Sequence, residues 1–465
     1  MSGRVILRAT EGPNRGEVYV FESHDVFIFG RDPECHACLG GTDTSASRQH
    51  FLLEVSPPAV RVRDLGSRNG TFIGERRIGG GDGRPAEVDL VDGDVLRVGT
   101  SAFVLKIELP VSCERCKREI RPESADAWAH AGPTNVCIHC RVLPPRPAAA
   151  AAMAPVACRA CGSEIAGERS ADDPLRMCNG CLARWADDPL ALLEPGSIAG
   201  VAVDRLLAVD ATGASYLGRR IADATPVAIH ARLARTRVTP AMRDAFVREL
   251  EQAGQLKHPN LVPLHAHGSS GPVFWSVTES GTGTVAAAIQ VAGGRLSPAE
   301  ALALAMTALA GLAHLHAHAV VHRDLKPANL LVAGPGVAKI GEVGLARAFG
   351  RAGLAGMTMT GATAGAVRFM PREQLLNFKA TRPQADVFSF GAILYTMLTG
   401  VGPREASPAV DPLLTVLRGP TVPIRQRDPQ LPAALAAVVD RACAPAWKDR
   451  QAHAGELLAE LQRAV

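Results

Sequence analysis

The sequence predicts a multidomain protein in which an all-β sandwich is followed by a cysteine-rich segment and then by a larger unit of strands and helices. The first 108 residues consist of short runs of alternating apolar and polar residues, separated by Gly, Asn and Asp. Eight of the 11 cysteines stand in four Cys-x-x-Cys pairs in the middle of the chain. From about residue 196 onward, strand patterns give way to long helical patterns. A chain of 465 residues is long enough for about three such domains, each with its own core.

The charge and hydropathy of the chain limit its partners. Its 50 Lys and Arg against 46 Asp and Glu give a net charge of +4, which is too small and too dispersed to indicate binding to nucleic acid or to an anionic membrane. The first residues, MSGRVILRAT, lack the apolar core of a secretory signal. An apolar stretch at 301–321 is interrupted by three histidines, so it predicts a buried core helix and not a membrane span. We therefore expect a cytoplasmic protein with no membrane or nucleic-acid partner.

The first segment, residues 1–108, is expected to form the sandwich. Runs such as DVFIFG at 25–30 and HFLLEV at 50–55 have the alternation of half-buried strands. Asn69-Gly70 and Asp92-Gly93 are dipeptides typical of tight hairpin turns, because these residues tolerate the positive φ that such turns require. We therefore expect a hairpin at each of these two dipeptides.

Polar residues that could bind a phosphate lie in the loops of this sandwich. Gly30-Arg31 follows one predicted strand, SRQH occupies 47–50, and LGSRNGT occupies 65–71. Two arginines, a serine hydroxyl and an asparagine amide at one end of a sandwich offer hydrogen bonds to a dianionic phosphate and to a peptide backbone. The alternative is that these are solvated loop residues and that Asn69-Gly70 only makes a turn.

Taken together, Gly30-Arg31, Ser47-Arg48 with His50, and Asn69-Gly70-Thr71 resemble, in their order and spacing, the forkhead-associated (FHA) domain. The resemblance covers nearly all of the first 108 residues. It implies recognition of phosphothreonine-containing proteins. By this resemblance, Arg31, Ser47 and Arg48 hold the phosphate, Asn69 holds the peptide backbone, and Gly30 and His50 shape the loops.

Two cysteine-rich segments, residues 109–142 and 157–190, are separated by a Pro- and Ala-rich linker at 143–156. In each segment, two Cys-x-x-Cys knuckles supply four thiolates, which make a closed tetrahedral shell for zinc with no open position for water. The second segment repeats the first, since CRACGSEI answers CERCKREI, as duplication of a zinc ribbon predicts. We therefore expect two structural zinc sites, held by Cys113, Cys116, Cys137 and Cys140 and by Cys158, Cys161, Cys178 and Cys181.

These cysteines have two alternative roles. A redox role is one, but nothing around them resembles the strand and helix of a thioredoxin-like motif. Binding of nucleic acid by the ribbons is the other, but it lacks the basic, aromatic-rich stretch that it would need. Segments this small bury too little apolar area to fold alone, so zinc is expected to supply their folding free energy.

The run HRDLKPANLL, residues 322–331, places three polar side chains at spacings that suit phosphoryl transfer. Asp324 would accept a hydroxyl proton, Lys326 would face the moving phosphate, and Asn329 would bind a metal ion. The run resembles the catalytic loop of eukaryotic-type serine/threonine protein kinases. The resemblance extends over residues 196–465 and implies an α+β domain of two lobes.

Two further features of this last domain support the resemblance. The run ADVFSFGAILYTMLTG at 385–400 resembles the central helix of the large kinase lobe, with Asp386 as its buried anchor. Arg450 matches a structural arginine of the family, and the resemblance pairs it with Glu373. Both features concern the frame of the domain and not its chemistry.

The nucleotide side of this domain departs from the family. The glycine-rich loop of the family corresponds to AVDATGASY at 208–216, in which Gly213 is the one glycine that remains. The phosphate-binding lysine corresponds to His230, in VAIH, and the metal-binding aspartate corresponds to Glu342, in EVG. Glutamate keeps the carboxylate but carries it one methylene further along the side chain.

The residue expected to pair with His230 lies on a predicted helix. The run TPAMRDAFVRELEQAGQL begins with an N-cap Thr239 and a first-turn Pro240, and its Glu249 matches the pairing glutamate of the family. A histidine is shorter than lysine and is mostly neutral at pH 7 unless Glu249 raises its pKa. Arg232, two residues further along the same strand face, is a candidate replacement cation.

These departures give two hypotheses for the kinase-like domain. Each lost contact costs about tenfold to a hundredfold in rate or nucleotide affinity, which predicts a pseudokinase with impaired or absent catalysis. The intact catalytic loop supports the alternative of an active serine/threonine kinase, because Glu342 with Asn329 could still hold Mg²⁺. Binding of ATP and Mg²⁺ therefore stays open at this point. Thr358, Thr360 and Thr363 are candidates for phosphorylation by another serine/threonine kinase, or they belong only to a mobile loop.

Overall fold

The computed structural model of the chain describes residues 4–22, 25–39, 44–80, 86–108, 111–112, 119–120, 198–210, 213–233, 238, 240–270, 273–351, 367–377, 381–405, 407 and 410–465. In the cysteine-rich segment it describes two short strands, β12 (Val111–Ser112) and β13 (Glu119–Ile120), which pair antiparallel. The other expectations for this segment concern residues outside the described part of the chain, and so do those for the eight zinc ligands, the linker at 143–156, Thr239, and Thr358, Thr360 and Thr363.

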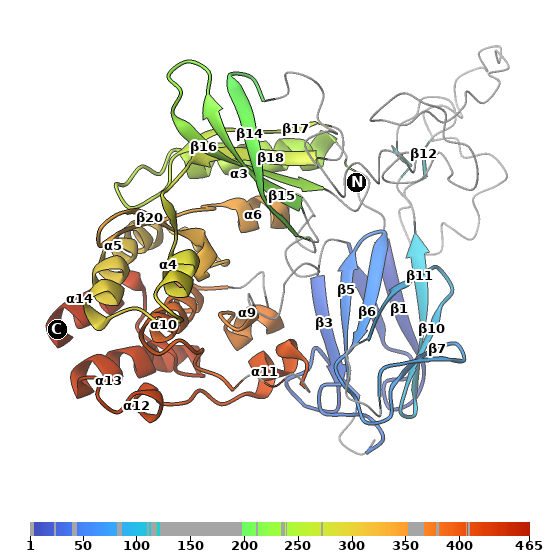
Figure 1. The fold of residues 1–465 in the computed structure, drawn as a ribbon. Coiled ribbons are helices and arrows are strands. Elements are labelled where there is room, and N and C mark those ends of the chain that lie inside the picture. Colours follow the sequence, from blue (N-terminus) through green and yellow to red (C-terminus); the bar gives the residue numbers. More distant parts are fainter. Residues whose placement is uncertain are drawn as a thin grey trace, which may run out of the picture.

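The N-terminal part of the chain forms the expected all-β sandwich of two sheets (Figure 1). One sheet has the order β2-β1-β11-β10-β7-β8 and the other has the order β4-β3-β5-β6-β9. Alternate residues of the strands fill the space between the sheets, and the rings of Phe29 and Phe51 stack there with centroids 4.5 Å apart. The strands are β1 (Arg4–Glu11), β2 (Val18–Phe21), β3 (Asp25–Gly30), β4 (Ala37–Cys38), β5 (Phe51–Ser56), β6 (Ala59–Asp64), β7 (Thr71–Ile73), β8 (Arg76–Ile78), β9 (Ala86–Leu90), β10 (Val95–Val98) and β11 (Ser101–Glu108).

The two turn dipeptides of the sandwich do not make hairpins. Asn69-Gly70 lies between β6 and β7, and Asp92-Gly93 lies between β9 and β10, and in both cases the two strands belong to different sheets. Gly70 and Gly93 have φ values of +81° and +88°, so the dipeptides bend the backbone as expected. The hairpin prediction is nevertheless wrong, because turn chemistry specifies a local bend and not which strands pair.

The smaller lobe of the C-terminal domain is a five-stranded antiparallel sheet with the order β14-β15-β16-β18-β17. Helix α3 (Pro240–Gly254) begins at the expected Pro240 and packs on this sheet, where Phe246 meets Phe274 at 4.8 Å between ring centroids. The strands are β14 (Val201–Asp210), β15 (Gly213–Arg220), β16 (Pro226–Leu233), β17 (Leu264–Ser270) and β18 (Val273–Glu279).

The larger lobe is helical and is built around α5 (Pro298–Ala317) and α10 (Pro383–Thr399) (Figure 1). A capping box of Ser297 and Glu300 starts α5, and every residue of α10 from Ala385 to Leu398 is buried. Among the described residues, α5 is the one helix long and apolar enough to cross a membrane, and half of its apolar window is buried in the fold. The other elements are β19 (Gly283–Thr284), β20 (Leu330–Gly334), β21 (Val337–Ile340), α4 (Val285–Val291), α6 (Leu345–Arg351), α9 (Arg372–Leu376), α11 (Pro412–Arg418), α12 (Ile424–Arg427), α13 (Ala433–Ala442) and α14 (Ala454–Ala464).

The sandwich packs directly on the larger lobe, and Figure 1 shows β3 beside α9 and α11. The side chain of Asp411, which caps α11, is fully buried and lies 2.9 Å from Nη2 of Arg63 on β6. One cluster of buried side chains spans the contact, and we call it the interdomain cluster. Its sandwich members are Val26, Ile28, Cys35, Leu52 and Leu65, and its members from the larger lobe are Val367, Leu375, Leu413, Leu414, Val416 and Leu417.

Candidate functional site

The three expected catalytic residues, Asp324, Lys326 and Asn329, lie together just before β20. Lys326 Nζ is 2.8 Å from Asp324 Oδ2, and Asn329 Nδ2 donates to the Asp324 carbonyl at 2.8 Å and to its Oδ2 at 3.1 Å. Burial opposes the ammonium charge, but the carboxylates of Asp324 and Glu342 outweigh it and raise the pKa of Lys326. A charged lysine therefore fixes Asp324, whose side chain is 35% exposed and could reach a hydroxyl group from solvent.

A buried carboxylate on α10 holds the backbone of this loop. Asp386, which is 1% exposed, accepts hydrogen bonds from the backbone N–H of His322 at 2.7 Å and of Arg323 at 2.9 Å. Its Oδ2 also lies 2.9 Å from Nε2 of His316. Burial disfavours the charge, but the hydrogen bond and charge of His316 and the other donors hold the pKa of Asp386 below its usual range. These bonds keep Arg323 in a left-handed conformation with φ of +68°, next to Asp324.

Glu342 follows β21 and faces three basic groups. Its Oε1 lies 3.7 Å from His230 Nδ1 and 3.8 Å from Arg232 Nη2. Burial alone would raise the pKa of Glu342, but Lys326, His230 and Arg232 together lower it. The carboxylate is therefore ionised at pH 7. Carboxylate and amide oxygens are ligands that Mg²⁺ accepts, so Glu342 and Asn329 fit this part of a nucleotide site.

His230 lies on β16, and the structure corrects the partner expected for it. Glu249 of α3 forms an ion pair with Arg347 of α6, with 2.9 Å between Oε2 and Nε. The hydroxyl of Ser215 lies 3.0 Å from His230 Nδ1, and Glu342 is the carboxylate that acts on the imidazole charge. Burial lowers the pKa of His230, and Glu342 only partly offsets this effect. His230 is therefore neutral at pH 7 and does not fit a clamp for a triphosphate.

Arg232 is the fixed positive charge that β16 places at this site. Arg232 follows His230 by two positions on the strand, so both side chains lie on the same face of the sheet. Its side chain is 18% exposed, and it pairs across the β15–β16 ladder with Gly213, the remaining glycine of the expected nucleotide loop. Gly213 also pairs with Asp210 of β14, while residues 211–212 between them lie outside the described part of the chain.

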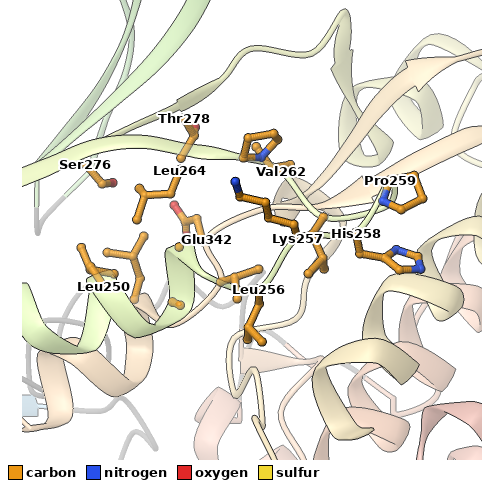
Figure 2. Close-up of a pocket in the computed structure, with 16 residues that line it drawn as sticks. Leu250, Leu256, Lys257, His258, Pro259, Val262, Leu264, Ser276, Thr278 and Glu342 are labelled. Carbon is orange, nitrogen blue, oxygen red and sulfur yellow. The ribbon is translucent and has the colours of Figure 1, made fainter. Parts of the chain in front are cut away.

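Glu342 also lines a cavity of about 620 Å³ (Figure 2). Figure 2 shows Glu342 among apolar side chains that include Leu250 and Leu264. The hydroxyl of Ser276, which is 1% exposed, also borders this space and has no hydrogen-bond partner within the described residues. The mostly apolar lining disfavours a charge on Glu342, and the basic groups Lys326, His230 and Arg232 offset this cost.

The four residues expected to bind a phosphopeptide, Arg31, Ser47, Arg48 and Asn69, lie in neighbouring loops at one end of the sandwich. The backbone N–H of Arg31 donates to the Ser47 carbonyl at 3.1 Å. The Asn69 side chain donates to the Ser45 carbonyl at 2.8 Å. The side chains of Arg31, Arg48 and Asn69 are exposed, so the loops are joined to one another while their donors stay open to a ligand.

The residues expected to shape these loops occupy tight positions. His50 is fully buried, and its Nδ1 accepts from the Ser47 N–H at 2.9 Å while its Nε2 lies 3.1 Å from the Gly70 carbonyl. A Cβ atom on Gly30 would stand 2.2 Å from the carbonyl oxygen of Arg48, so a side chain at position 30 would push this loop away.

The pair of Arg450 and Glu373 is also present, as expected. Arg450 Nη1 lies 2.5 Å from Glu373 Oε1 and Nη2 lies 3.2 Å from Oε2, and the arginine side chain is fully buried. Because Glu373 is on α9, this bidentate pair ties α9 to the C-terminal end of the fold.

Two residues that contact the site were not expected from the sequence, Ser215 and Arg347. Ser215 lies directly opposite His230 in the β15–β16 ladder, and residues so placed touch, so the strand pairing would have signalled it. Nothing in the sequence marks Arg347. Its contact with Glu249 depends on how α6 packs on α3, where Phe349 meets Phe246 with centroids 5.3 Å apart.

Comparison with known proteins identifies two domains. The family model "Protein kinase domain" matches residues 207–451, and the model "FHA domain" matches residues 27–99. Both domains expected from the sequence are thus confirmed. Neither of these two matches covers the expected zinc ribbons.

Similar proteins include several bacterial kinases. Serine/threonine-protein kinase PrkC of Bacillus subtilis is 29% identical over 219 residues, which are 47% of this chain and 33% of that protein. Serine/threonine-protein kinase PknB of Mycobacterium leprae is 30% identical over 228 residues, which are 48% of this chain and 36% of that protein. The chain therefore spans little more than a third of the length of these two relatives. A solved structure, "Crystal structure of Rad53 1-466 in complex with AMP-PNP", matches 98% of this chain and 99% of its own with a TM-score of 0.47 and 17% identity.

Proposed function

Because the chain belongs to the protein kinase family and also carries an FHA domain, we propose that it is a phospho-signalling protein with an impaired kinase. It binds phosphothreonine-containing proteins through Arg31, Ser47, Arg48 and Asn69, and another serine/threonine kinase is a candidate among them. Its kinase domain transfers phosphate slowly or not at all. We place this activity in the cytoplasm.

The observation that supports impaired catalysis is the charge of β16. A phosphate-binding lysine is a fixed cation, whereas the partly buried His230 is neutral and lies beside an ionised glutamate. Glu342 carries its carboxylate one methylene further than aspartate, and a misplacement of about 1 Å costs on the order of a hundredfold in rate. A triphosphate entering this site would therefore lack the cation that lysine supplies at position 230. It would also meet the Glu342 carboxylate one methylene further along its side chain than that of an aspartate.

An active kinase is the second candidate, and two observations favour it. Asp324, Lys326 and Asn329 are held at hydrogen-bonding distances in the arrangement that phosphoryl transfer needs. Arg232 adds a positive charge on the same strand face as His230 and could face a phosphate in its place. In this case Asp324 is the base, and Asn329 with Glu342 holds Mg²⁺.

Phosphate transfer by the purified full chain separates the two candidates. With ATP labelled at its γ-phosphate and a general protein substrate, we expect a rate at least about 10⁴-fold below the ~1–100 s⁻¹ typical of protein kinases. The matched variant Asp324→Asn should then give the same background. Incorporation that is clearly above background and disappears in Asp324→Asn would establish an active kinase and contradict our proposal. A thermal shift with Mg²⁺ and ATP shows independently whether the nucleotide binds.

Titration with a phosphothreonine peptide and its unmodified threonine counterpart tests the FHA domain. Arg31→Ala is expected to weaken phosphopeptide binding by about tenfold to a hundredfold, because it removes a charge-assisted contact to a dianion. Arg76→Ala, on β8 and away from the phosphopeptide loops, is the matched control and should bind as the natural chain does. Equal affinity of the natural chain for the two peptides would refute phosphothreonine recognition.

The zinc ribbons remain a proposal that the cysteine spacing supports. Metal analysis of the purified protein is expected to find two zinc ions per chain, and Cys113→Ser should lower this content to one. Chelation should release the metal and expose the cysteines to a thiol reagent, because a closed thiolate shell protects them only while zinc is bound. Cysteines that react fully before chelation, in protein free of zinc, would point to the redox alternative.

A further inference from the structure

A continuous line of polar contacts joins the phosphopeptide loops to α11 of the kinase domain. Arg48 Nη2 and Gln49 Nε2 both donate to Oδ2 of Asp32, each at 3.1 Å. On its other side, Gln49 accepts from Arg418: Nε bonds the side-chain oxygen, and Nη2 lies 3.4 Å from the carbonyl. Gln49 is only 4% exposed, so it is fixed between the two domains. Arg48, which is expected to hold the phosphate, is therefore linked through Asp32 and Gln49 to Arg418, the last residue of α11.

Positive charge gathers around these loops from both domains. Asp32, whose side chain is 7% exposed, is the carboxylate that Arg48 faces, and Arg372 of α9 acts on it as well. Partial burial lowers the pKa of Arg418, Arg48 lowers it further, and Asp32 raises it. Since like charges repel, the combined positive charge of Arg31, Arg48 and Arg418 favours the binding of an anion at these loops.

We propose that the kinase domain completes the phosphothreonine site, with Arg418 of α11 acting on the bound phosphate together with Arg31 and Arg48. This inference rests on the proposed recognition of phosphothreonine by the FHA domain. It adds a residue that lies outside the FHA match at 27–99 and makes peptide binding depend on the contact between the domains.

The interactions of Asp32 determine whether contact between the domains strengthens or weakens phosphopeptide binding. A dianionic phosphate at Arg48 competes with Asp32 for the same guanidinium, and it also attracts Arg418 directly. When Arg48 binds the phosphate, it no longer neutralises Asp32. The Asp32 carboxylate then interacts more strongly with Arg372 and Arg418, which lie across the interface. Both effects strengthen attraction between the domains, so phosphopeptide binding and domain packing stabilise each other. By linkage, each must raise the equilibrium constant of the other by the same factor.

In the alternative role, Arg418 only donates a hydrogen bond to Gln49 and stabilises the interface, and its charge does not act on the phosphate. Arg418→Gln separates the two roles, because glutamine keeps an N–H donor for Gln49 and removes the charge. Arg425→Gln on α12 is the matched control, since it removes one exposed arginine charge from the same lobe away from the loops.

Phosphothreonine-peptide affinity of the full chain is measured at low ionic strength by calorimetry or fluorescence anisotropy. We expect Arg418→Gln to weaken binding by about tenfold, Arg418→Lys by less, and Arg425→Gln by less than twofold. An Arg418→Gln protein that binds within twofold of the natural chain overturns the inference, and so does an equal loss in Arg425→Gln. These results leave the proposed function intact as long as Arg31→Ala weakens binding as expected. Equal affinity of the natural chain for the phosphorylated and unmodified peptides would instead refute both the proposed function and this inference.

Hydrogen exchange gives a second readout that does not depend on affinity. Saturation with the phosphopeptide is expected to slow amide exchange in residues 413–418 of the natural chain, because the interface is tightened. The slowing should be lost in Arg418→Gln examined at saturating peptide. Unchanged exchange in these residues of the natural chain would contradict the coupling.

Discussion

Replacing both His230 with lysine and Glu342 with aspartate is expected to raise the rate of phosphate transfer by about 10²- to 10⁴-fold. Lysine restores a fixed cation where the partly buried imidazole is neutral. A charge-assisted contact of about 1.5–3 kcal/mol corresponds to roughly tenfold to a hundredfold in rate. Aspartate draws the metal-binding carboxylate back by one methylene, which recovers on the order of a hundredfold if position is what limits it. The two residues contact each other, so their gains need not simply multiply.

The measurement is transfer of labelled γ-phosphate to a general protein substrate by the full chain. His230→Gln combined with Glu342→Asp is the matched control, because it places a neutral side chain on β16 and should recover only the part due to aspartate. Adding Asp324→Asn to the double variant must return the rate to background. A double variant that stays at background would show that the single Gly213 in the nucleotide loop, and not the charge of β16, limits the reaction.

Asp386→Ala is expected to lower the free energy of unfolding by about 3–5 kcal/mol. The carboxylate is 1% exposed and accepts from the backbone of His322 and Arg323 and faces His316, so its loss leaves buried donors without an acceptor. The pKa of Asp386 is lower in the fold than in the unfolded chain, so its contribution is present above about pH 4 and is lost as the pH falls through the folded value. The difference between the natural chain and Asp386→Ala should therefore shrink in acid.

Urea unfolding followed by intrinsic fluorescence measures this difference. Asp204→Ala is the matched control, because Asp204 pairs with Arg219 on the surface of the smaller lobe and an exposed pair contributes only about 0–1 kcal/mol. Equal midpoints for the two variants would mean that the loop backbone finds other acceptors and that Asp386 is not its anchor.

Local patterns predicted most of the sandwich and little of its topology. The runs at 25–30 and 50–55 became β3 and β5 almost residue for residue, because alternation of polarity reflects the two faces of a strand. The dipeptide Asn69-Gly70 correctly predicted a bend of the backbone. It wrongly predicted a hairpin, because the chain crosses there from one sheet to the other. Which strands pair depends on contacts far apart in sequence, and a dipeptide carries no information about them.

The candidate active site was predictable where its residues are close in sequence. Asp324, Lys326 and Asn329 lie within six positions of one another, so their spacing alone brings them together. Glu249 was different, because its partner depended on the tilt of α3 and on α6, which offers Arg347. Burial is the second quantity that sequence did not supply. The neutrality of His230 follows from its partly buried position on β16, between β15 and β18 of the sheet, and not from its side chain alone.

The contact between the sandwich and the larger lobe had no signal in the sequence. Leu413, Leu414 and Leu417 of α11 have the spacing of any amphipathic helix, and Ile28 and Leu52 have the spacing of any strand with two covered faces. A pattern of this kind shows that a face is covered but not by what. The link through Gln49 and Arg418 could be recognised only once the two domains were placed together.

The interdomain cluster has a practical consequence for anyone who takes this protein apart. Separating the sandwich from the larger lobe would expose the leucines of α11 on one fragment and apolar side chains of β3 and β5 on the other. Exposed apolar patches of this kind promote aggregation or binding by chaperones. Either fragment alone is thus expected to be less stable and less soluble than the same domain in the full chain. Cleavage between the sandwich and the larger lobe is accordingly expected to destabilise both domains together.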